Sequence, residues 1–272
     1  MAYQTYIPPP PLSDFVDMFW SYEGYEPPHS RERVIPTGKM QVIVNLREDV
    51  LRVYDRQDHR RFQSLGGSLI SGTHSRFVVI DTASQASTVG VLFKAGGAQP
   101  FLEISAGELR DADVPLDALW GTKATELRGR LLEAQTPEAR FGVLEQALLA
   151  QVARPLTHHP AVAFALRAFQ RMPRTRRAVK EVSERTSLSQ RRFIQLFREE
   201  VGLTPKLFCR ILRFQEVIRL VGSERHVEWA ELALRCGYFD QAHFVHDFRA
   251  FSGTTPTNYL AHRGEHPNHV PL

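Results

Sequence analysis

The sequence predicts an α+β protein: an N-terminal antiparallel β-barrel-like domain with following helices, and a C-terminal all-α domain of two helix-turn-helix units joined by a long helix. Three observations support this prediction. Short β-rich runs precede Pro100, helical periodicity follows it, and the pattern of residues 187–205 returns 51 positions later. A repeat at a fixed offset is typical of a duplicated structural unit.

Length and composition suit two domains of ordinary size. The chain has 272 residues, 43% of them hydrophobic, which is enough to build a core in each domain. From Pro160 onward there are 18 Lys and Arg against 11 Asp and Glu, whereas the preceding part has 16 against 19. This asymmetry suits attraction of phosphate by the rear half, although a solvated basic face has the same counts.

Targeting segments and metal sites are not indicated. The sequence has no run of about 18 apolar residues, and its N-terminus lacks a charged start followed by an apolar segment. We therefore expect a cytoplasmic protein without a membrane partner. Cys209 and Cys236 are too few and too far apart for a zinc ribbon or a disulfide scaffold, so we expect core thiols, no metal and no cofactor.

The front half reads as short strands separated by turn formers such as Gly66-Gly67 and Gly96-Gly97. Before them, Ser13 is expected to cap a helical turn with Phe15, Val16 and Phe19, and an extended segment is expected from Trp20. Strands at this spacing without helices between them favour an antiparallel barrel or sandwich. The predicted strands are Met40–Leu46, Val50–Tyr54, Arg76–Ile80 and Thr88–Phe93.

Two helices are predicted next, at Thr122–Glu133 and Pro137–Ala153. Their apolar stripes either pack on the β-rich domain or form a dimer seam, and the sequence leaves both readings open. The stripes consist of Leu127, Leu131, Leu144, Leu148 and Val152. We place the domains at residues 1–155 and 160–263, followed by a flexible tail at 264–272.

The repeated stretch predicts two similar helices. One begins after Ser189 and ends at Gly202, and the other begins after Asp240 and ends at Gly253. Phenylalanines at helical spacing form an apolar face on each, and the opposite faces are polar. The outward residues are Gln190, Arg191, Gln195 and Arg198 in the first copy, and Gln241, His243 on the shoulder, His246 and Arg249 in the second.

The remaining helices complete two helix-turn-helix units around a stem. They are predicted at Ala161–Arg171, Thr175–Arg185, Pro205–Val221 (the stem), Val227–Cys236 and from Pro256 through Leu260.

Two such units on one stem, ending GYFDQAHFVHDFRAFSGTTPTNY, resemble the DNA-binding domain of the AraC/XylS family of transcription regulators. The resemblance covers about residues 161–263 and departs from the family at Thr186, where a smaller turn residue is common. In the front half, VIPTGKMQVIVNL and GVLFKAGGAQPF are similar to β-rich sensor domains that precede this module. That similarity implies a sensing or dimerisation domain and names no ligand.

The resemblance implies that the chain is not an enzyme and that double-stranded DNA is its partner, read in two successive major grooves roughly 34 Å apart. It allows RNA polymerase, a small-molecule effector and a second copy of the chain as further partners. Arginine suits guanine, glutamine suits adenine, and Ile194 and Ala242 suit thymine methyls. The base-reading residues expected are Gln190, Arg191, Ile194, Gln195, Gln241, Ala242, His243 and His246. The phosphate contacts expected are Arg174, Arg176, Arg177, Lys180, Arg198, Lys206 and Arg249.

Three alternative readings of the sequence require other features. His243 and His246 have a metal-ligand spacing, but no third ligand follows at a fitting position. A DNA-targeted enzyme needs a reactive site, whereas the histidines of the front half are scattered singly. A regulator whose front half only dimerises needs no ligand; the aromatic residues that would line a pocket, or else belong to the core, are Trp20, Phe77, Phe93 and Trp120.

Overall fold

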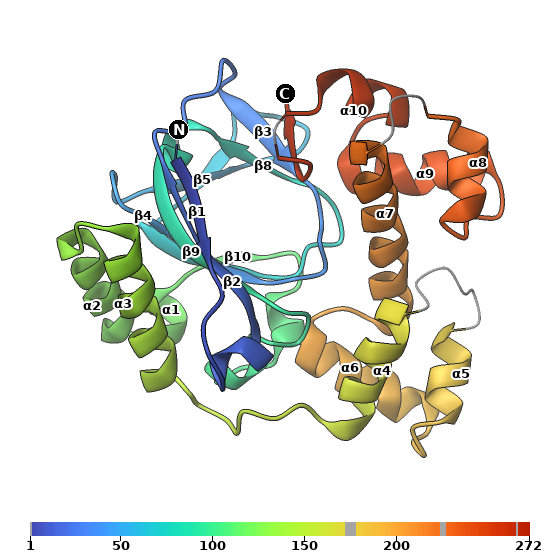
Figure 1. The fold of residues 1–272 in the computed structure, drawn as a ribbon, viewed down its shortest axis with the longest axis horizontal. Helices are drawn as coiled ribbons and strands as arrows, with labels where there is room; N and C mark the ends of the chain where they lie inside the picture. The colour runs from blue at the N-terminus through green and yellow to red at the C-terminus, as the bar shows by residue number, and fades with distance from the viewer. Residues whose placement is uncertain (1, 172–177, 224–226, 265) are drawn as a thin grey trace.

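The computed structural model describes residues 2–171, 178–223, 227–264 and 266–272. The chain forms two sheets, and Figure 1 shows helices on one side of them and the helical rear half beside them. The predicted α+β class is confirmed, since an antiparallel β-domain is followed by helices and the chain continues into two helix-turn-helix units. Here "β-domain" means the two sheets with α1–α3, and "helical region" means α4–α10. The boundary between them near residues 155–160 stays a prediction.

Two antiparallel sheets form the β-domain. The six-stranded sheet has the order β1-β2-β9-β4-β7-β10, with bounds Ala2–Tyr6, Val16–Glu23, Ser87–Phe93, Gln41–Asn45, Ser68–Ser71 and Asp113–Pro115. The five-stranded sheet has the order β11-β3-β8-β5-β6, with bounds His269–Pro271, Arg31–Val34, Val78–Asp81, Leu51–Tyr54 and Phe62–Leu65.

Alternation along the six-stranded sheet sends side chains to two different environments. Val42 and Val44 of β4 are fully buried in the core shared with α2 and α3. Gln41 and Ile43 point the other way and line a cavity between the two sheets. The predicted alternation is therefore confirmed from Met40 to Val44, where the second face of the strand borders an internal space. It is wrong beyond Val44, since Asn45 is buried and Leu46 is half-buried.

The expected helical turn at Phe15, Val16 and Phe19 is wrong. A short 3-10 turn occupies Leu12–Asp14, and β2 begins at Val16. β2 lies between β1 and β9, and its adjacent residues Phe19 and Trp20 are both buried, so its apolar residues do not follow a simple alternation. The pairing also shifts register between Val16 and Met18, which disturbs the pattern further.

The helices after the sheets are α1 Asp117–Trp120, α2 Thr122–Glu133 and α3 Pro137–Ala150. Leu127, Leu131, Leu144 and Leu148 are buried in the core of the β-domain, as one of the two readings expected. Helix α3 ends three residues before the expected Ala153, and Val152 is exposed.

The helical region contains a helix at each range predicted for it, and the start predicted at Thr175 lies outside the described residues. Their bounds are α4 Pro160–Arg171, α5 Ala178–Glu184, α6 Gln190–Val201, α7 Pro205–Ser223, α8 Trp229–Arg235, α9 Gln241–Ser252 and α10 Pro256–His262. One apolar cluster unites these helices, and it includes Ile35, Ala95 and Val270 from the β-domain side. No helix among the described residues is long and apolar enough to cross a membrane.

The expectation of an unstructured tail from Gly264 is wrong for residues 269–271. These residues form β11, which pairs with β3 and so adds an edge strand to the β-domain. Val270 is buried, and Ile35 N donates to Asn268 O at 3.0 Å. The tail thus leads from the last helix back to the sheet (Figure 1).

Candidate functional site

Helices α6 and α9 begin and end as the repeat predicts. Ser189 Oγ accepts a hydrogen bond from Arg192 N at 3.3 Å, and Asp240 Oδ1 accepts one from His243 N at 2.7 Å. Each helix stops at a glycine in the left-handed conformation, Gly202 with φ 86° or Gly253 with φ 70°. The two helices are therefore equivalent in construction as well as in sequence.

Their apolar faces pack on α7. The Phe208 ring of α7 lies 5.6 Å from the Phe197 ring of α6, and the Phe214 ring lies 5.2 Å from the Phe248 ring of α9. Figure 1 shows α6 near one end of α7 and α9 near the other. Because these faces are buried, the opposite faces of α6 and α9 look outward.

An ion pair fixes α9 on α7 more specifically. Arg210 Nη2 lies 2.6 Å from Asp247 Oδ1, and the Asp247 side chain is 2% exposed. The Arg210 guanidinium also lies over the Phe251 ring, 5.3 Å from its centroid. A buried carboxylate needs such a partner, so the orientation of α9 depends on Arg210.

Most predicted base-reading residues lie exposed on these outward faces: Gln190, Arg191, Gln195, Gln241, Ala242 and His246. Three of the eight have competing contacts. Gln195 Nε2 donates to Glu199 Oε1 at 2.8 Å, and Ile194 packs partly against the core. His243 lies 5.3 Å from the Tyr238 ring and 3.8 Å from Asp247. Their roles stay predictions.

The predicted phosphate contacts Lys180, Arg198, Lys206 and Arg249 are exposed. Lys180 lies 3.8 Å from Glu184, at the distance of a surface ion pair. Arg174, Arg176 and Arg177 lie outside the described residues.

Sequence reasoning missed two arginines of the β-domain beside α9. Arg76 and Arg110 line a groove of about 480 Å³ together with Lys206, Arg210 and His246. Arg110 is 3.3 Å from Asp111, and Arg210 is paired with Asp247. Nothing in the sequence pattern could place Arg76 and Arg110 next to the helical region, because the contact is between distant segments.

One loop of the β-domain contacts the ends of both outward-facing helices. A Cβ at Gly202 would lie 2.2 Å from Thr73 Oγ1, and a Cβ at Gly253 would lie 2.4 Å from the Phe77 ring. Thr73 and Phe77 belong to the segment 72–77 between β7 and β8, which we call the docking loop. Gly72 and His74 of the same loop line the cavity between the sheets.

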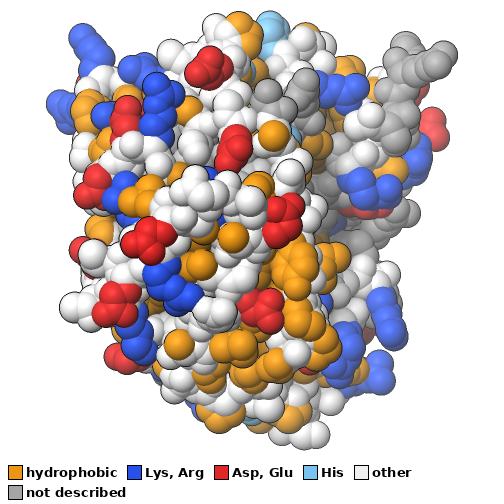
Figure 2. Space-filling model, turned by 60° about the vertical axis from the view of Figure 1, so that its left-hand side comes forward, with side chains coloured by type: hydrophobic (Ala, Val, Ile, Leu, Met, Phe, Trp, Pro, Cys, Tyr) orange, Lys and Arg blue, Asp and Glu red, His pale blue; other side chains and the backbone are white. Residues whose placement is uncertain are grey.

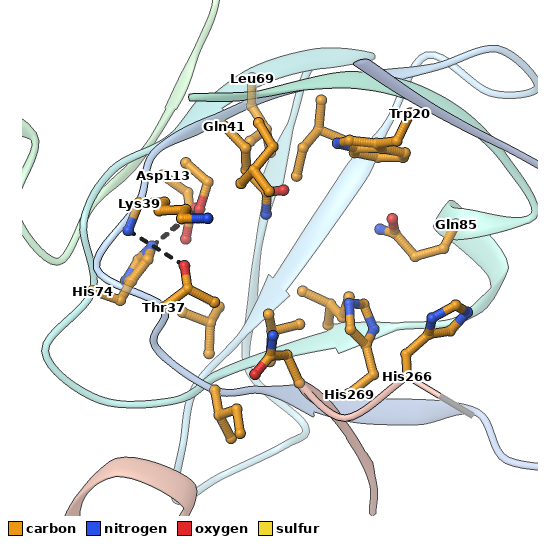
Figure 3. Close-up of a pocket in the computed structure, with 18 of the residues that line it drawn as sticks. Trp20, Thr37, Lys39, Gln41, Leu69, His74, Gln85, Asp113, His266 and His269 are labelled. Carbon is orange, nitrogen blue, oxygen red and sulfur yellow. Dashed lines mark hydrogen bonds and ion pairs between the residues drawn. The ribbon is translucent and has the colours of Figure 1, made fainter. Parts of the chain in front are cut away.

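This cavity has a volume of about 330 Å³. Its walls come from both sheets and from the tail, and Figure 3 shows His266 and His269 on one side of it and His74 and Asp113 on another. Of the four aromatic residues that the sequence offers for a pocket or for the core, Trp20 lines the cavity. Phe93 and Trp120 belong to the core, and Phe77 packs on Gly253.

The charged side chains around the cavity have partners. Lys39 Nζ lies 2.6 Å from Asp17, and Arg52 Nη1 lies 3.5 Å from Asp81. The remaining pairs are His74 with Asp113 at 3.3 Å and His269 with Glu32 at 2.7 Å. The lining is thus partly polar, and each of these charged side chains is paired with a side chain of opposite charge.

Glu32 of β3 holds the tail by its contact with His269 of β11. Its side chain is 1% exposed and bonds His269 at 2.7 Å, His29 at 2.6 Å and the Tyr25 hydroxyl. Burial by itself would raise the pKa of this carboxyl, but the bonds and charge of His269, with Tyr25 and His29, outweigh it. They lower the pKa of Glu32 from 4.5 to about 2.

Metal-ligating residues do not converge in the described parts of the chain. No group of three His, Cys, Asp or Glu side chains there could hold a metal ion, His243 and His246 included. Cys236 is buried and Cys209 half-buried, and burial raises the pKa of the Cys209 thiol to about 12. Both cysteines are the core thiols that the sequence predicted.

Apolar side chains remain exposed on the side of β1 and α3. The Tyr6 ring stacks on Phe141 at 5.8 Å, and Ile7 next to Tyr6 is exposed. Leu149 of α3 and Val152 just after α3 are exposed as well. Figure 2 brings the left-hand side of Figure 1 forward, and hydrophobic side chains gather in the lower half of this face.

Two domain families match the chain. Residues 182–262 match a family described as a helix-turn-helix domain, and residues 4–115 match a domain of unknown function, DUF6597. Part of the chain is 32% identical over 82 residues to LumQ of Photobacterium leiognathi, named a probable transcriptional regulator. Part of the chain is also 27% identical over 95 residues to an uncharacterized HTH-type transcriptional regulator of Haemophilus influenzae.

These matches cover 30% and 35% of the chain, and the chain spans about a third of each relative's length, 33% and 32%. Among solved structures, ToxT from Vibrio cholerae is similar with a TM-score of 0.48 and 8% identity, covering 96% of this chain and 98% of ToxT. A ToxT structure with bound unsaturated fatty acid has a TM-score of 0.46 and 11% identity, covering 89% and 93%.

Proposed function

Since residues 182–262 form a helix-turn-helix domain of AraC type behind a DUF6597 domain, we propose that this chain is a DNA-binding transcription regulator that reads two successive major grooves. The observation that carries the proposal is the pair of equivalent helices, α6 and α9, held on one stem with polar faces outward. The relatives are named as regulators, which favours this function over a DNA-targeted enzyme.

The length of the stem suits two grooves on one side of a duplex. Helix α7 has 19 residues, which corresponds to roughly 28 Å at the rise of an α-helix. Successive major grooves on one face lie roughly 34 Å apart. Helices packed near the two ends of α7 can therefore enter neighbouring grooves of one asymmetric site.

Each outward face offers side chains suited to base edges. Arg191 donates bidentately to guanine, whereas Gln190 and Gln241 bond adenine. Exposed cations near the helices, Lys206 and Arg249 among them, hold phosphates and position the faces. Arg76 and Arg110 add positive charge to the same side of α9.

We propose that the β-domain senses a small molecule in the cavity between its sheets. The docking loop supports this, since Gly72 and His74 border the cavity while Thr73 and Phe77 contact the ends of α6 and α9. A cavity of drug-pocket size also favours sensing over a β-domain that only dimerises.

We propose further partners from the surface of the chain and from its proposed function. The exposed apolar side chains near β1 and α3 suit contact with a second copy of the chain. RNA polymerase is a natural partner of a transcription regulator, and a cytoplasmic location follows from binding DNA in a bacterial cell.

The test begins with selection of binding sites from random duplexes by the full chain. Interference by major-groove base modification is then mapped on a selected site. We expect two clusters of interfering positions on one face, with centres about 10 base pairs apart. A single cluster would refute the reading of two grooves.

The internal repeat supplies matched variants for this test. Gln190→Ala and Gln241→Ala change equivalent positions of α6 and α9. Each variant should remove interference in one cluster and leave the other unchanged. If both variants affect the same cluster, the two helices do not occupy separate grooves.

A further inference from the structure

The cavity between the sheets has one aromatic wall. Trp20 and Tyr22 of β2 line it together with Tyr3 of β1, whose ring stacks on Tyr22 at 4.4 Å. A Cβ at Gly90 would lie 2.4 Å from Trp20 Cζ2 and 2.6 Å from Cε2, so the missing side chain at Gly90 makes room for the indole. The indole is held against β9 on one side and borders the cavity on another.

Two glutamine amides face the same space. Gln41 of β4 and Gln85, in the short turn before β9, line the cavity, and Figure 3 shows both amide groups pointing into its centre. Neither side chain makes a hydrogen bond with a residue that the structure describes. Each amide offers a donor and an acceptor side by side, which suits a planar ligand edge with the complementary pair.

The charges of the lining argue against a charged ligand. Lys39, Arg52, His74 and His269 each have an acidic partner. A charged molecule would enter without an unpaired counter-charge and would lose its hydration, which is costly in an enclosed site.

Apolar side chains form part of the remaining walls. They consist of Ile43, Leu69 and Leu92 on the six-stranded sheet, and Val53, Val78 and Ile80 on the five-stranded sheet. Such walls favour a ring system over a sugar or another polyhydroxylated molecule, because hydroxyl groups against them would stay without partners.

We propose that the cavity binds a flat, uncharged aromatic or heteroaromatic molecule whose face lies against Trp20 and whose polar edge bonds Gln41 and Gln85. The proposal rests on the proposed function in one respect, in that it takes this molecule as the signal for the DNA-binding helices. Binding itself is a property of the β-domain and is measured separately.

Three probes of similar size separate the features of this ligand class. The first is 2-quinolone, which is flat, uncharged and carries an N–H beside a C=O. The second is octahydro-2-quinolone, which keeps the lactam but loses the flat ring. The third is quinoline-2-carboxylate, which keeps the flat ring but carries a charge. Titration calorimetry with the full chain should show one site for 2-quinolone and at least tenfold weaker binding of the other two.

Variants test the two amides. Gln41→Leu and Gln85→Leu should each weaken 2-quinolone binding roughly tenfold, as expected for loss of about one net hydrogen bond. Gln63→Leu, an exposed position on β6, is the matched control and should bind as the unchanged chain does. Thermal melting without ligand verifies that all three variants fold.

The proposal is overturned if 2-quinolone does not bind, if the carboxylate or the saturated lactam binds equally well, or if both glutamine variants bind normally. DNA affinity, measured with and without 2-quinolone, tells this failure apart from failure of the proposed function. If the chain binds 2-quinolone but no duplex, the proposed ligand class stands and the proposed function as a regulator is refuted. If the chain binds duplex but none of the three probes, the proposed function stands and the proposed ligand class is refuted.

Discussion

Arg191 and Arg192 are adjacent and exposed at the start of α6, but they leave the helix about 100° apart. Arg191 lies on the outward face with Gln195. We expect Arg191→Ala to weaken binding to a selected site by about 1 to 3 kcal/mol and to relax base preference at one position. Competition with singly substituted duplexes measures both effects.

Arg192→Ala is the matched control, since it removes the same charge from the same helix turn. It should lower affinity slightly and to the same degree for every duplex. If Arg191→Ala behaves in this uniform way, Arg191 contacts phosphate and does not read a base.

Glu32 gives the tail a defined dependence on pH. The pKa of its carboxyl is lowered from 4.5 to about 2 in the folded chain, so its contribution is fully present above pH 4.5. That contribution is lost as the pH falls from about 4.5 to about 2, and it amounts to roughly 3 kcal/mol at most. Acid titration of stability, followed by thermal melting, should show this loss.

Glu32→Gln should remove that part of the acid dependence and lower stability at neutral pH, because the buried amide cannot replace the charge facing His269. Hydrogen exchange of the β11 amides should rise in the same variant. Glu126→Gln, at an exposed position of α2, is the control and should change neither property. Unchanged exchange in Glu32→Gln would show that the tail docks without this carboxylate.

At the scale of elements, the docking loop makes Gly253 more than a helix stop. An alanine there would need a φ of 70° and would collide with the Phe77 ring at 2.4 Å. We expect Gly253→Ala to destabilise the chain by roughly 2 kcal/mol or more, from backbone strain plus the collision. Chemical denaturation measures the loss.

Gly222→Ala is the control, because a Cβ at Gly222 of α7 meets nothing within 4 Å. It should be neutral or slightly stabilising. The double variant Gly253→Ala with Phe77→Ala should lose less than the sum of the two single losses, since the second change removes the collision. Simple additivity would mean that the Phe77 contact is not formed.

Local signals account for the elements that could be predicted from the sequence. Helices α6 and α9 carry their own caps, their apolar spacing and their stop glycines, so each is recognisable without its surroundings. Strands β4 and β9 are rich in valine and could be recognised in the same way. Strands β3 and β11 could not, because RERV and HVP have little apolar character and depend on backbone pairing with distant partners.

On the scale of the whole molecule, the outward faces of α6 and α9 could be predicted, whereas the cavity could not. Gln41, Gln85 and His266 come from segments far apart in the sequence, and only the fold brings them to one space. The contact of Arg76 with the groove beside His246 is of the same kind. Sequence periodicity reports which face of an element is buried, but not which other element faces it.

The two halves of the chain also share a core more closely than two separate domains would. Ile35, Ala95 and Val270 are buried in the cluster of the helical region. Gln215 of α7 donates to Pro36 O at 2.8 Å and to Asn268 Oδ1 at 3.0 Å. The β-domain is therefore in direct contact with α7, the stem that carries α6 and α9.

The tail turns the helical region into a closed loop. The helical region is connected to the β-domain at its start by residues 151–159 and at its end by β11. It is therefore held at both ends, whereas a domain joined by one linker is held at one. A large movement of α6 and α9 away from the sheets requires β11 to separate from β3. This separation also removes His266 and His269 from the cavity wall. Moving α6 and α9 away from the sheets would therefore also open the cavity.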